Sequence, residues 1–403
     1  MTLTITRLTA AGDGMADGEG PFPRTLPGEA IERAPDGSAR IITPTAARVK
    51  APCRHFKSCG GCAMQHASDD FVAGWKTSVI ETGLRVRGIE TEIKPILTSP
   101  AQSRRRAVLH GKRTKSGAMI GFHARGSDLL IEAPDCQLLD PAIIAAFPAL
   151  EELTILAASR KAVIELVVIL SENGIDLDMR GCKPLDPQSA LKAASIAEQH
   201  RFARIAWNDE VIGLRAPPTQ LFGEAHVTPP PGAFLQATLH GQQVLTQCVR
   251  DAVGNAGQIA DLFAGCGTFS LPVAVQSEVW ALEGDADLIA ALDQGWRNAT
   301  GLKKITAETR DLFRRPVLAD EFKKTEAVII DPPRAGAEAQ SHEIAQSKVP
   351  RIAAVSCNPV TFARDAEIFI NGGYRLEWVQ PVDQFRWSAH VELAALFTRP
   401  HIA

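Results

Sequence analysis

The sequence predicts an α/β protein whose C-terminal half contains a doubly wound, mostly parallel sheet. From about residue 220 onward, short apolar segments suited to buried strands alternate with helical stretches, which is typical of parallel strands joined by crossover helices. The expected parallel strands are 258–263, 278–283, 327–331 and 351–357. Two more β-prone segments, 374–382 and 391–398, are close enough in sequence to pair antiparallel at the edge of this sheet.

Three domains are expected along the chain. At 403 residues it exceeds the size at which a single hydrophobic core keeps growing. Residues 1–50 combine turn signals with short alternating segments, which indicate a small β barrel. Residues 51–215 begin with a loop dense in cysteine and glycine and continue as an α+β middle domain, and residues 216–403 carry the doubly wound sheet.

Charge and hydropathy argue against a membrane protein, a secreted protein and a protein that binds nucleic acid through its overall charge. A net charge of −3 gives no overall attraction to a polyanion, so a nucleic acid would have to bind a local patch. The N-terminus lacks the layout of a signal peptide, and no apolar run is long enough to span a bilayer. We therefore expect a cytoplasmic protein without membrane contact. No feature indicates an obligate protein partner, and a monomer is expected.

The first expected strand runs into a glycine-containing turn, Asp261–Phe269. Gly265 and Gly267 allow the backbone to approach a ligand at the carboxyl end of the strand. The turn lacks the third glycine of G-x-G-x-x-G, so it matches a nicotinamide dinucleotide site poorly. Glu283 ends the second strand, where a carboxylate can accept hydrogen bonds from both ribose hydroxyls of an adenosine. Together the turn and Glu283 resemble the S-adenosylmethionine site of class I methyltransferases.

Two later strands also end in reactive side chains, Asp331 and Cys357. In the strand order usual for methyltransferases these ends adjoin the cofactor turn, and the antiparallel last strand begins at the same edge with Glu392. A thiol, a carboxylate and a methyl donor in one pocket suit methylation at C5 of a pyrimidine. Thiolate addition to C6 makes C5 nucleophilic, and a base then removes the C5 proton. Cys357 is the expected nucleophile and Glu392 the expected base.

Two segments around these residues resemble the signatures of the RNA uracil-5 methyltransferase family. The first signature joins Asp331–Gly336 (DPPRAG) to Ile352–Asn358 (IAAVSCN), with Ala354 in place of a tyrosine. The second is similar to Asp383–Glu392 (DQFRWSAHVE), where arginine and serine replace the family's proline and threonine at the fourth and sixth positions. These departures affect loop shape and packing rather than the reacting groups.

The resemblance implies roles for further residues. It assigns Cys357 as nucleophile and Glu392 as base. The cofactor-binding set, with Gly265 taken from the turn itself, is Gln236, Phe263, Gly265, Thr268, Glu283, Asp311 and Asp331. Thr268 stands where relatives often have asparagine, and Asp311 where they have asparagine or aspartate.

Four cysteines form a separate group: Cys53, Cys59 and Cys62, with Cys136 far downstream. Four thiolates can hold zinc or an iron–sulfur cluster, and the spacing alone slightly favours zinc because zinc sites are commoner. The resemblance to the uracil-5 family implies a [4Fe-4S] cluster with a structural or RNA-contacting role, since methyl transfer needs no electron.

RNA contacts are expected in the first two domains. Residues 100–126 contain seven cations and no carboxylate, which indicates a local basic patch; they are Arg104, Arg105, Arg106, Lys112, Arg113, Lys115 and Arg125. The first 50 residues resemble a shortened TRAM domain, an oligonucleotide-binding-like barrel.

The resemblance implies SAM-dependent methylation of a specific uridine in 23S rRNA. Relatives that modify tRNA usually lack the cysteine group and the N-terminal barrel, which favours rRNA over tRNA. The alternatives are a tRNA uracil-5 methyltransferase, an RNA cytosine-5 methyltransferase, whose Pro-Cys or Thr-Cys pair is absent at Cys357, and a non-catalytic RNA-binding assembly factor.

Overall fold

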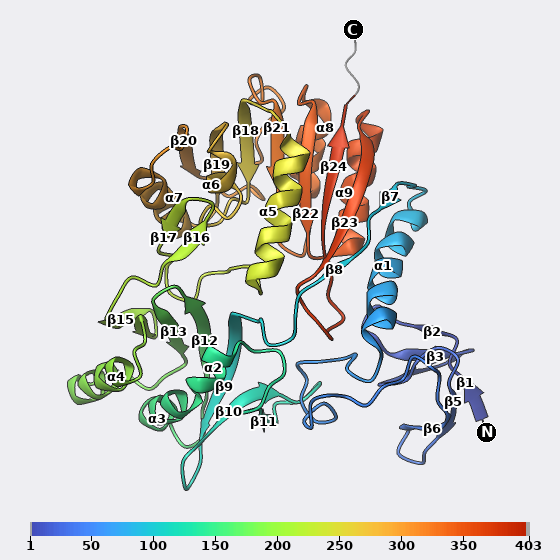
Figure 1. Ribbon diagram of the computed structural model, residues 1–403, viewed down its shortest axis with the longest axis vertical. Helices are drawn as coiled ribbons and strands as arrows, with labels where there is room; N and C mark the ends of the chain where they lie inside the picture. The colour runs from blue at the N-terminus through green and yellow to red at the C-terminus, as the bar shows by residue number, and fades with distance from the viewer. Residues whose placement is uncertain (1, 400–403) are drawn as a thin grey trace.

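The computed structural model describes residues 2–399, so the outermost residues of the expected first and third domains lie outside it (Figure 1). A large sheet with its helices forms the upper part of the view. A second sheet lies below it, and the N-terminal strands lie at the lower right beside the long helix α1 (Asp69–Val86). The strands therefore form three groups, but α1 and residues 92–98, which belong to the expected middle domain, pack with the upper sheet.

The upper sheet has nine strands and confirms the expected α/β class. Its order is β20-β19-β18-β21-β22-β24-β23-β7, and β8 also pairs with β23. The strands β18 to β22 run parallel, and β24 lies antiparallel between β22 and β23. The bounds are β18 (Gln258–Leu262), β19 (Glu278–Glu283), β20 (Ile305–Thr309), β21 (Ala327–Ile330), β22 (Arg351–Ser356), β23 (Arg375–Asp383), β24 (Glu392–Thr398), β7 (Glu92–Ile93) and β8 (Leu97–Thr98).

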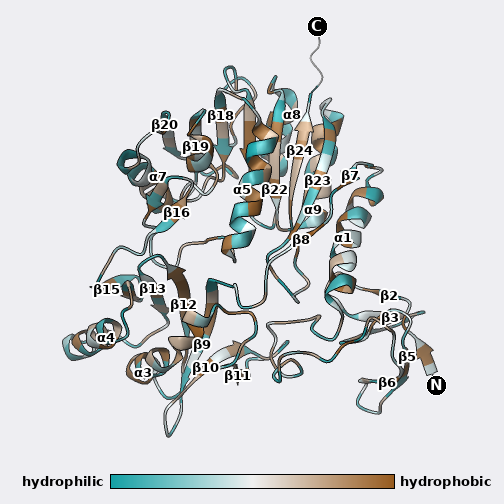
Figure 2. Cartoon of the chain, in the orientation of Figure 1, coloured by the Kyte–Doolittle hydropathy of each residue, from teal (hydrophilic) through white to brown (hydrophobic). Residues whose placement is uncertain are grey.

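Helices cover both faces of this sheet, so alternate strand residues enter two different cores. Ile259 packs in the core that contains α5, whereas Ala260 packs in the core that contains α1, α8 and α9. Helix α5 shows both hydrophobic and hydrophilic sides in Figure 2, as an amphipathic covering helix must. The helices are α5 (Leu239–Val253), α6 (Ser270–Val273), α7 (Ala286–Asn298), α8 (Glu338–Gln346) and α9 (Pro359–Asn371).

Three strands of the upper sheet were not expected from the sequence. β20 reads Ile-Thr-Ala-Glu-Thr and lies at the sheet edge, where only Ile305 is buried, so it lacks the apolar run of a central strand. β7 and β8 have two residues each and come from the segment after α1, more than 270 residues before their partner β23. Such short, distant pairings leave no periodic signal.

The middle region forms a seven-stranded sheet in the order β11-β10-β9-β12-β13-β14-β15, with helices packed on it around one core. The elements are β9 (Arg106–Arg113), β10 (Ala118–His123), β11 (Leu130–Glu132), α2 (Pro141–Ala145), α3 (Phe147–Ala157), β12 (Val163–Ser171), β13 (Gly174–Arg180), α4 (Pro187–Gln199), β14 (Arg204–Trp207) and β15 (Glu210–Leu214). The short hairpin β16 (Gln220–Phe222) and β17 (Ala225–Val227) leads into the upper sheet.

The N-terminal strands form two three-stranded sheets, β1-β5-β6 and β2-β3-β4, rather than one continuous barrel sheet. They share a small core that includes Ile5, Phe22 and Ile31. The bounds are β1 (Thr2–Thr4), β2 (Arg7–Leu8), β3 (Gly14–Ala16), β4 (Glu19–Phe22), β5 (Ala30–Arg33) and β6 (Ala39–Thr43). Within residues 2–399, no helix combines the length and apolar character needed to cross a membrane.

The run Arg104–Arg106 does not form the solvent-facing patch expected from its charge. Arg105 is buried and donates hydrogen bonds to the carbonyl of Gln236 (3.2 Å) and to the side chain of Gln242 (2.6 Å). Arg106 donates to the carbonyl of Ala233 (3.0 Å). The hydrogen bonds of Arg105 and Arg106 are accepted by backbone and amide oxygens of the protein rather than by phosphates. The interpretation of the run as an RNA-contact patch is therefore wrong for Arg105, whereas Arg104 and Arg106 are half-buried.

Candidate active site

A cavity of about 410 Å³ lies at the carboxyl edge of the upper sheet, where the ends of β18, β19, β21 and β22 meet the start of β24. All nine candidate cofactor and catalytic residues line it: Gln236, Phe263, Gly265, Thr268, Glu283, Asp311, Asp331, Cys357 and Glu392. The structure thus brings together residues that span 157 positions of the sequence, from 236 to 392 inclusive. Their individual roles remain predictions.

The turn after β18 is shaped by backbone conformations that glycine tolerates best. Gly267 has φ of 96°, and a Cβ there would lie 2.8 Å from Leu271 Cδ1, so a side chain would collide with the following helix. Gly265 has φ of 55° with open space above it, and Phe263 adopts φ of 63° without being glycine. Such backbone strain in a non-glycine residue is typical of functional sites.

Glu283 is held in place by backbone N–H groups. Its Oε1 accepts hydrogen bonds from Gly284 N (2.6 Å) and Asp285 N (3.1 Å), and its Oε2 accepts from Gly265 N (3.1 Å). These bonds fix the carboxylate at the rim of the cavity and tie the end of β19 to the glycine turn. A carboxylate has about four acceptor positions, so capacity for a ligand hydroxyl remains.

The register of β22 and β24 explains why Cys357 and Glu392 meet. Ser356 pairs antiparallel with Leu393, so the next positions in register are Cys357 and Glu392. Asn358 caps helix α9 and its side chain donates to the carbonyl of Arg334 (2.9 Å), which ties the Cys357 turn to the end of β21. The nucleophile candidate and the base candidate are thus neighbours through strand pairing.

Burial dominates the electrostatics of this group. Burial, with the negative charge of Glu392 and Asp331 adding to it, raises the pKa of the Cys357 thiol to about 11. Burial also raises the pKa of Glu392 to about 7, against a hydrogen bond from Gln384 that lowers it. The pKa of Asp331 is raised well above its usual range by burial and by the charge of Glu392. Anions are therefore disfavoured in this cavity.

Comparison with known proteins adds independent evidence. The tRNA (uracil-5-)-methyltransferase family matches residues 230–400. An uncharacterized RNA methyltransferase of Brucella suis is 41% identical over 98% of this chain and 97% of its own length. The 23S rRNA (uracil(1939)-C(5))-methyltransferase RlmD of Thiobacillus denitrificans is 30% identical over 89% of this chain and 88% of its own. The chain belongs to the RNA uracil-5 methyltransferase family.

Membership of the RNA uracil-5 methyltransferase family makes S-adenosylmethionine the cofactor and RNA the substrate. The fold agrees with a solved relative, the Pyrococcus abyssi tRNA (uracil-54, C5)-methyltransferase in complex with S-adenosyl-L-homocysteine. That structure superposes with a TM-score of 0.74 at 21% identity and covers 99% of both chains. The cavity at the carboxyl edge suits this cofactor, since it offers a strained glycine turn and a fixed carboxylate on adjacent strands.

Two aromatic residues of the cavity were not identified from the sequence. Phe313 is 54% exposed and its ring centroid lies 5.4 Å from that of Phe263, and Phe234 is 63% exposed beside Gln236. Exposed phenylalanines on a cavity wall offer flat apolar surface for a base. The only sequence signal for either is its position beside another expected site residue, two after Asp311 or two before Gln236.

The four cysteines of the family pattern line one small cavity of about 30 Å³, together with Arg104. Among residues 2–399, no group of three or more potential ligands is arranged to hold a metal ion. A single zinc ion requires every sulfur about 2.3 Å from one centre, whereas a cluster binds each thiolate to a different iron and so separates them. The four thiols line one cavity, and their role as ligands of a cluster stays a prediction.

A buried ion pair supports the segment that carries Glu392. Lys76 of α1 is fully buried, and its Nζ lies 2.6 Å from Asp383 Oδ1 and 3.0 Å from the carbonyl oxygen of Phe385. The next residue, Gln384, uses its side chain to bond both Gln236 and the backbone N–H of Ala237. Lys76 therefore anchors the loop whose glutamine contacts the cavity wall, and nothing in the sequence pattern of α1 indicates this role.

We expect Lys76→Met to destabilise the protein by about 3–5 kcal/mol, because it leaves the Asp383 carboxylate buried without its cation. The double variant Lys76→Met/Asp383→Asn removes that unpaired charge and should recover part of the loss. Thermal unfolding followed by circular dichroism measures both. Lys192→Met, an exposed lysine on α4, is the matched control and should change little. Equal melting temperatures for Lys76→Met and the wild type would contradict the role of the pair.

Proposed function

We propose that this protein methylates C5 of a uridine in 23S rRNA through a covalent intermediate, with Cys357 as nucleophile and Glu392 as base. The observation that supports it most directly is the strand register that sets a thiol beside a buried carboxylate in the cavity of a family that uses S-adenosylmethionine. Asp331, Glu283 and the glycine turn belong to the same cavity.

The chemistry divides between the two residues. The Cys357 thiolate adds to C6 of uracil, and the C5–C6 π electrons move toward C5 and O4 to give an enolate. S-adenosylmethionine supplies the electrophilic methyl group that bonds to C5. The Glu392 carboxylate then removes the C5 proton, the C5–C6 double bond re-forms and the Cys357 sulfur leaves. The protein needs no redox step.

The raised pKa of Cys357 means that the thiol needs nearby positive charge to ionise at neutral pH. A thiol with a pKa of about 11 is almost wholly protonated at neutral pH, and two neighbouring carboxyl groups make its ionisation harder. Positive charge entering the cavity favours the thiolate, as Arg334 already does to a smaller extent. Glu392, with a pKa of about 7, is close to the value that suits a base at physiological pH.

A 23S rRNA target is supported by the 30% identity to the Thiobacillus denitrificans rRNA enzyme over most of both chains. The tRNA enzyme of Pyrococcus abyssi matches the fold over 99% of both chains, so the N-terminal parts do not by themselves exclude tRNA. Mass mapping of rRNA and tRNA from cells with and without this protein distinguishes the two. Loss of one 5-methyluridine from 23S rRNA supports the proposal, and loss only from tRNA rejects this target.

The cysteine cavity is proposed to hold a [4Fe-4S] cluster. Cys53, Cys59, Cys62 and Cys136 would be its ligands. Burial raises the pKa of Cys62 to about 12, so its thiolate requires compensating positive charge of the kind that iron supplies. Arg104 also lines the cavity, and the charges of Cys136 and Cys62 act on it. The cluster would join the N-terminal loop to the middle sheet.

We expect Cys357→Ala and Glu392→Gln to fail at different steps. With RNA that contains 5-fluorouracil, the wild type should form a covalent adduct that survives denaturing electrophoresis, and Cys357→Ala should form none. With ordinary RNA, Glu392→Gln should accumulate the adduct, because its methylated C5 keeps the proton, and turnover should fall about 10²–10⁴-fold. An adduct in Cys357→Ala, or none in the wild type, would reject the covalent mechanism.

The release step should depend on pH through Glu392. Its carboxylate form removes the proton, and its pKa is about 7, so release should rise about tenfold per pH unit below 7 and level off above it. Rapid-quench single-turnover kinetics between pH 5.5 and 8.5 measure this step. Glu392→Gln provides the control, since its residual rate should lose the rise. A wild-type rate that stays constant over this range would contradict the assignment.

The cluster proposal predicts a brown protein when purification excludes oxygen, with broad absorbance near ~400 nm. About four iron and four sulfide per chain should be found. Cys62→Ser should lose the colour, whereas Cys248→Ser, which removes a half-buried cysteine on α5, should keep it. Stoichiometric zinc in a colourless sample would contradict the assignment.

A further inference from the structure

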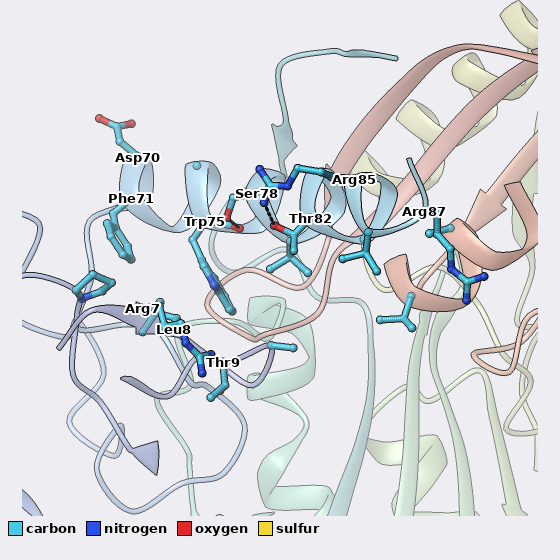
Figure 3. Close-up of a pocket in the computed structure, with 18 residues that line it drawn as sticks. Arg7, Leu8, Thr9, Asp70, Phe71, Trp75, Ser78, Thr82, Arg85 and Arg87 are labelled. Atoms are coloured by element: carbon cyan, nitrogen blue, oxygen red, sulfur yellow. Dashed lines mark hydrogen bonds between the residues drawn. The ribbon is translucent and has the colours of Figure 1, made fainter. Parts of the chain in front are cut away.

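A second large cavity shares no lining residue with the cavity that contains Cys357. It has a volume of about 950 Å³ and runs along α1 between strand β2 and the start of α9. We call this cavity the α1 groove. Figure 3 shows Trp75 pointing from α1 toward Leu8 and Thr9 of the N-terminal segment, and Arg85 and Arg87 at the opposite end of the helix. Neither the cofactor nor the proposed chemistry uses this groove.

One face of α1 forms its wall. Phe71, Trp75, Ser78, Thr82 and Arg85 are spaced by three or four residues, so their side chains lie along the same side of the helix. Two aromatic rings thus precede two hydroxyl groups and a cation. Ser78, Thr82 and Arg85 are exposed, and Phe71 and Trp75 are partly exposed. The stripe combines stacking surface with hydrogen-bonding groups along one direction.

The charge of the groove is positive although the chain as a whole is not. Arg7, Arg85 and Arg87 line it against a single carboxylate, Asp70. Arg87 is paired with Glu367, but within residues 2–399 Arg7 and Arg85 make no salt bridge, and Arg85 donates only to Thr82 (3.1 Å). Two cations are therefore available to an anionic ligand.

The groove ends close to the nucleophile. Val360, which is 66% exposed, and Ala363 of α9 form its far end. Val360 is three residues from Cys357, so their Cα atoms are at most about 11 Å apart along an extended chain. Gly83 of α1 packs on the same turn, where an added Cβ would lie 3.2 Å from the carbonyl oxygen of Pro359. A ligand in the groove would therefore lie next to the turn that holds the catalytic thiol.

We propose that the α1 groove binds the single-stranded RNA segment that flanks the target uridine. Proteins hold single strands by combining aromatic rings with cations in one groove, since bases stack on the rings while Lys and Arg neutralise phosphates. The proposal rests on the proposed function, because the flanking segment belongs to the same substrate. A protein segment or a second copy would gain apolar contact but would leave Arg7 and Arg85 without partners.

The test uses the full chain and a fluorescein-labelled, unstructured RNA 12-mer, with fluorescence anisotropy at several salt concentrations. The double variant Arg7→Glu/Arg85→Glu should bind at least tenfold more weakly. Losing two phosphate contacts should reduce the slope of log K against log salt by about 1.4. Phe71→Leu should lower affinity severalfold with the slope unchanged, because it removes an aromatic ring but no charge and keeps an apolar side chain against Leu26 and Met64. Arg160→Glu, an exposed arginine outside the groove, is the matched control and should remain near the wild type.

Hydrogen exchange with and without the same RNA provides a second readout that needs no substitution. Peptides covering residues 71–87 should become protected on RNA binding. Unchanged affinity in both groove variants, or protection elsewhere only, would overturn the proposal, and so would a dimer in sedimentation that Phe71→Leu dissociates. None of these measurements requires methyl transfer. A wild type that forms no 5-fluorouracil adduct yet shows the groove effects would instead reject the proposed function alone.

Discussion

The antiparallel pairing of β24 with β22 is the constraint on which the site depends. Parallel strands alone would bring the cofactor turn, Glu283, Asp331 and Cys357 to one edge of the sheet. The proposed base, Glu392, would be missing from that edge. Inserting β24 between β22 and β23 reverses one strand, so its first residue rather than its last reaches that edge. Because a register slip of one residue would turn Glu392 to the other face of the sheet, strand pairing fixes both its position and its direction.

The site accumulates buried acids whose ionisation the fold disfavours. Burial raises the pKa of Asp261, beneath the glycine turn, to about 7, and Asp331 and Glu392 experience the same effect. These groups repel one another as anions, so the cavity favours positive charge. A cofactor that carries a sulfonium suits such a cavity, and its charge would favour the carboxylate of Glu392 and the thiolate of Cys357 together. Binding and activation would then share one electrostatic cause.

The sequence predicted those parts of the molecule that follow from local pattern. Buried parallel strands read as apolar runs, and their ends carry polar residues, so the pattern itself indicated the central strands with Glu283, Asp331 and Cys357. Gln236, Phe263, Thr268 and Asp311 came only from the family resemblance, and they line the same cavity. The edge strands were not predicted, because β20 is polar and because β7 and β8 pair with a strand far along the chain. The role of Lys76 was not predicted either, because its partner Asp383 is 307 residues away and one lysine on an amphipathic helix gives no sign of such a distant contact.

The arginine run shows why composition misleads when the surroundings of a charge are unknown. Of the seven cations in this acid-free segment, Lys112, Lys115 and Arg125 are exposed, but Arg105 is buried against residues of the upper domain. Arg104 lines the cysteine cavity, and the adjacent Arg105 holds the carbonyl of Gln236 at the cofactor cavity. Successive strand residues point to opposite faces, so neighbours in sequence reach different sites. The hydrogen-bond partners of Arg105 and Arg106 are backbone carbonyls and side-chain amides, which no count of charges in the sequence includes.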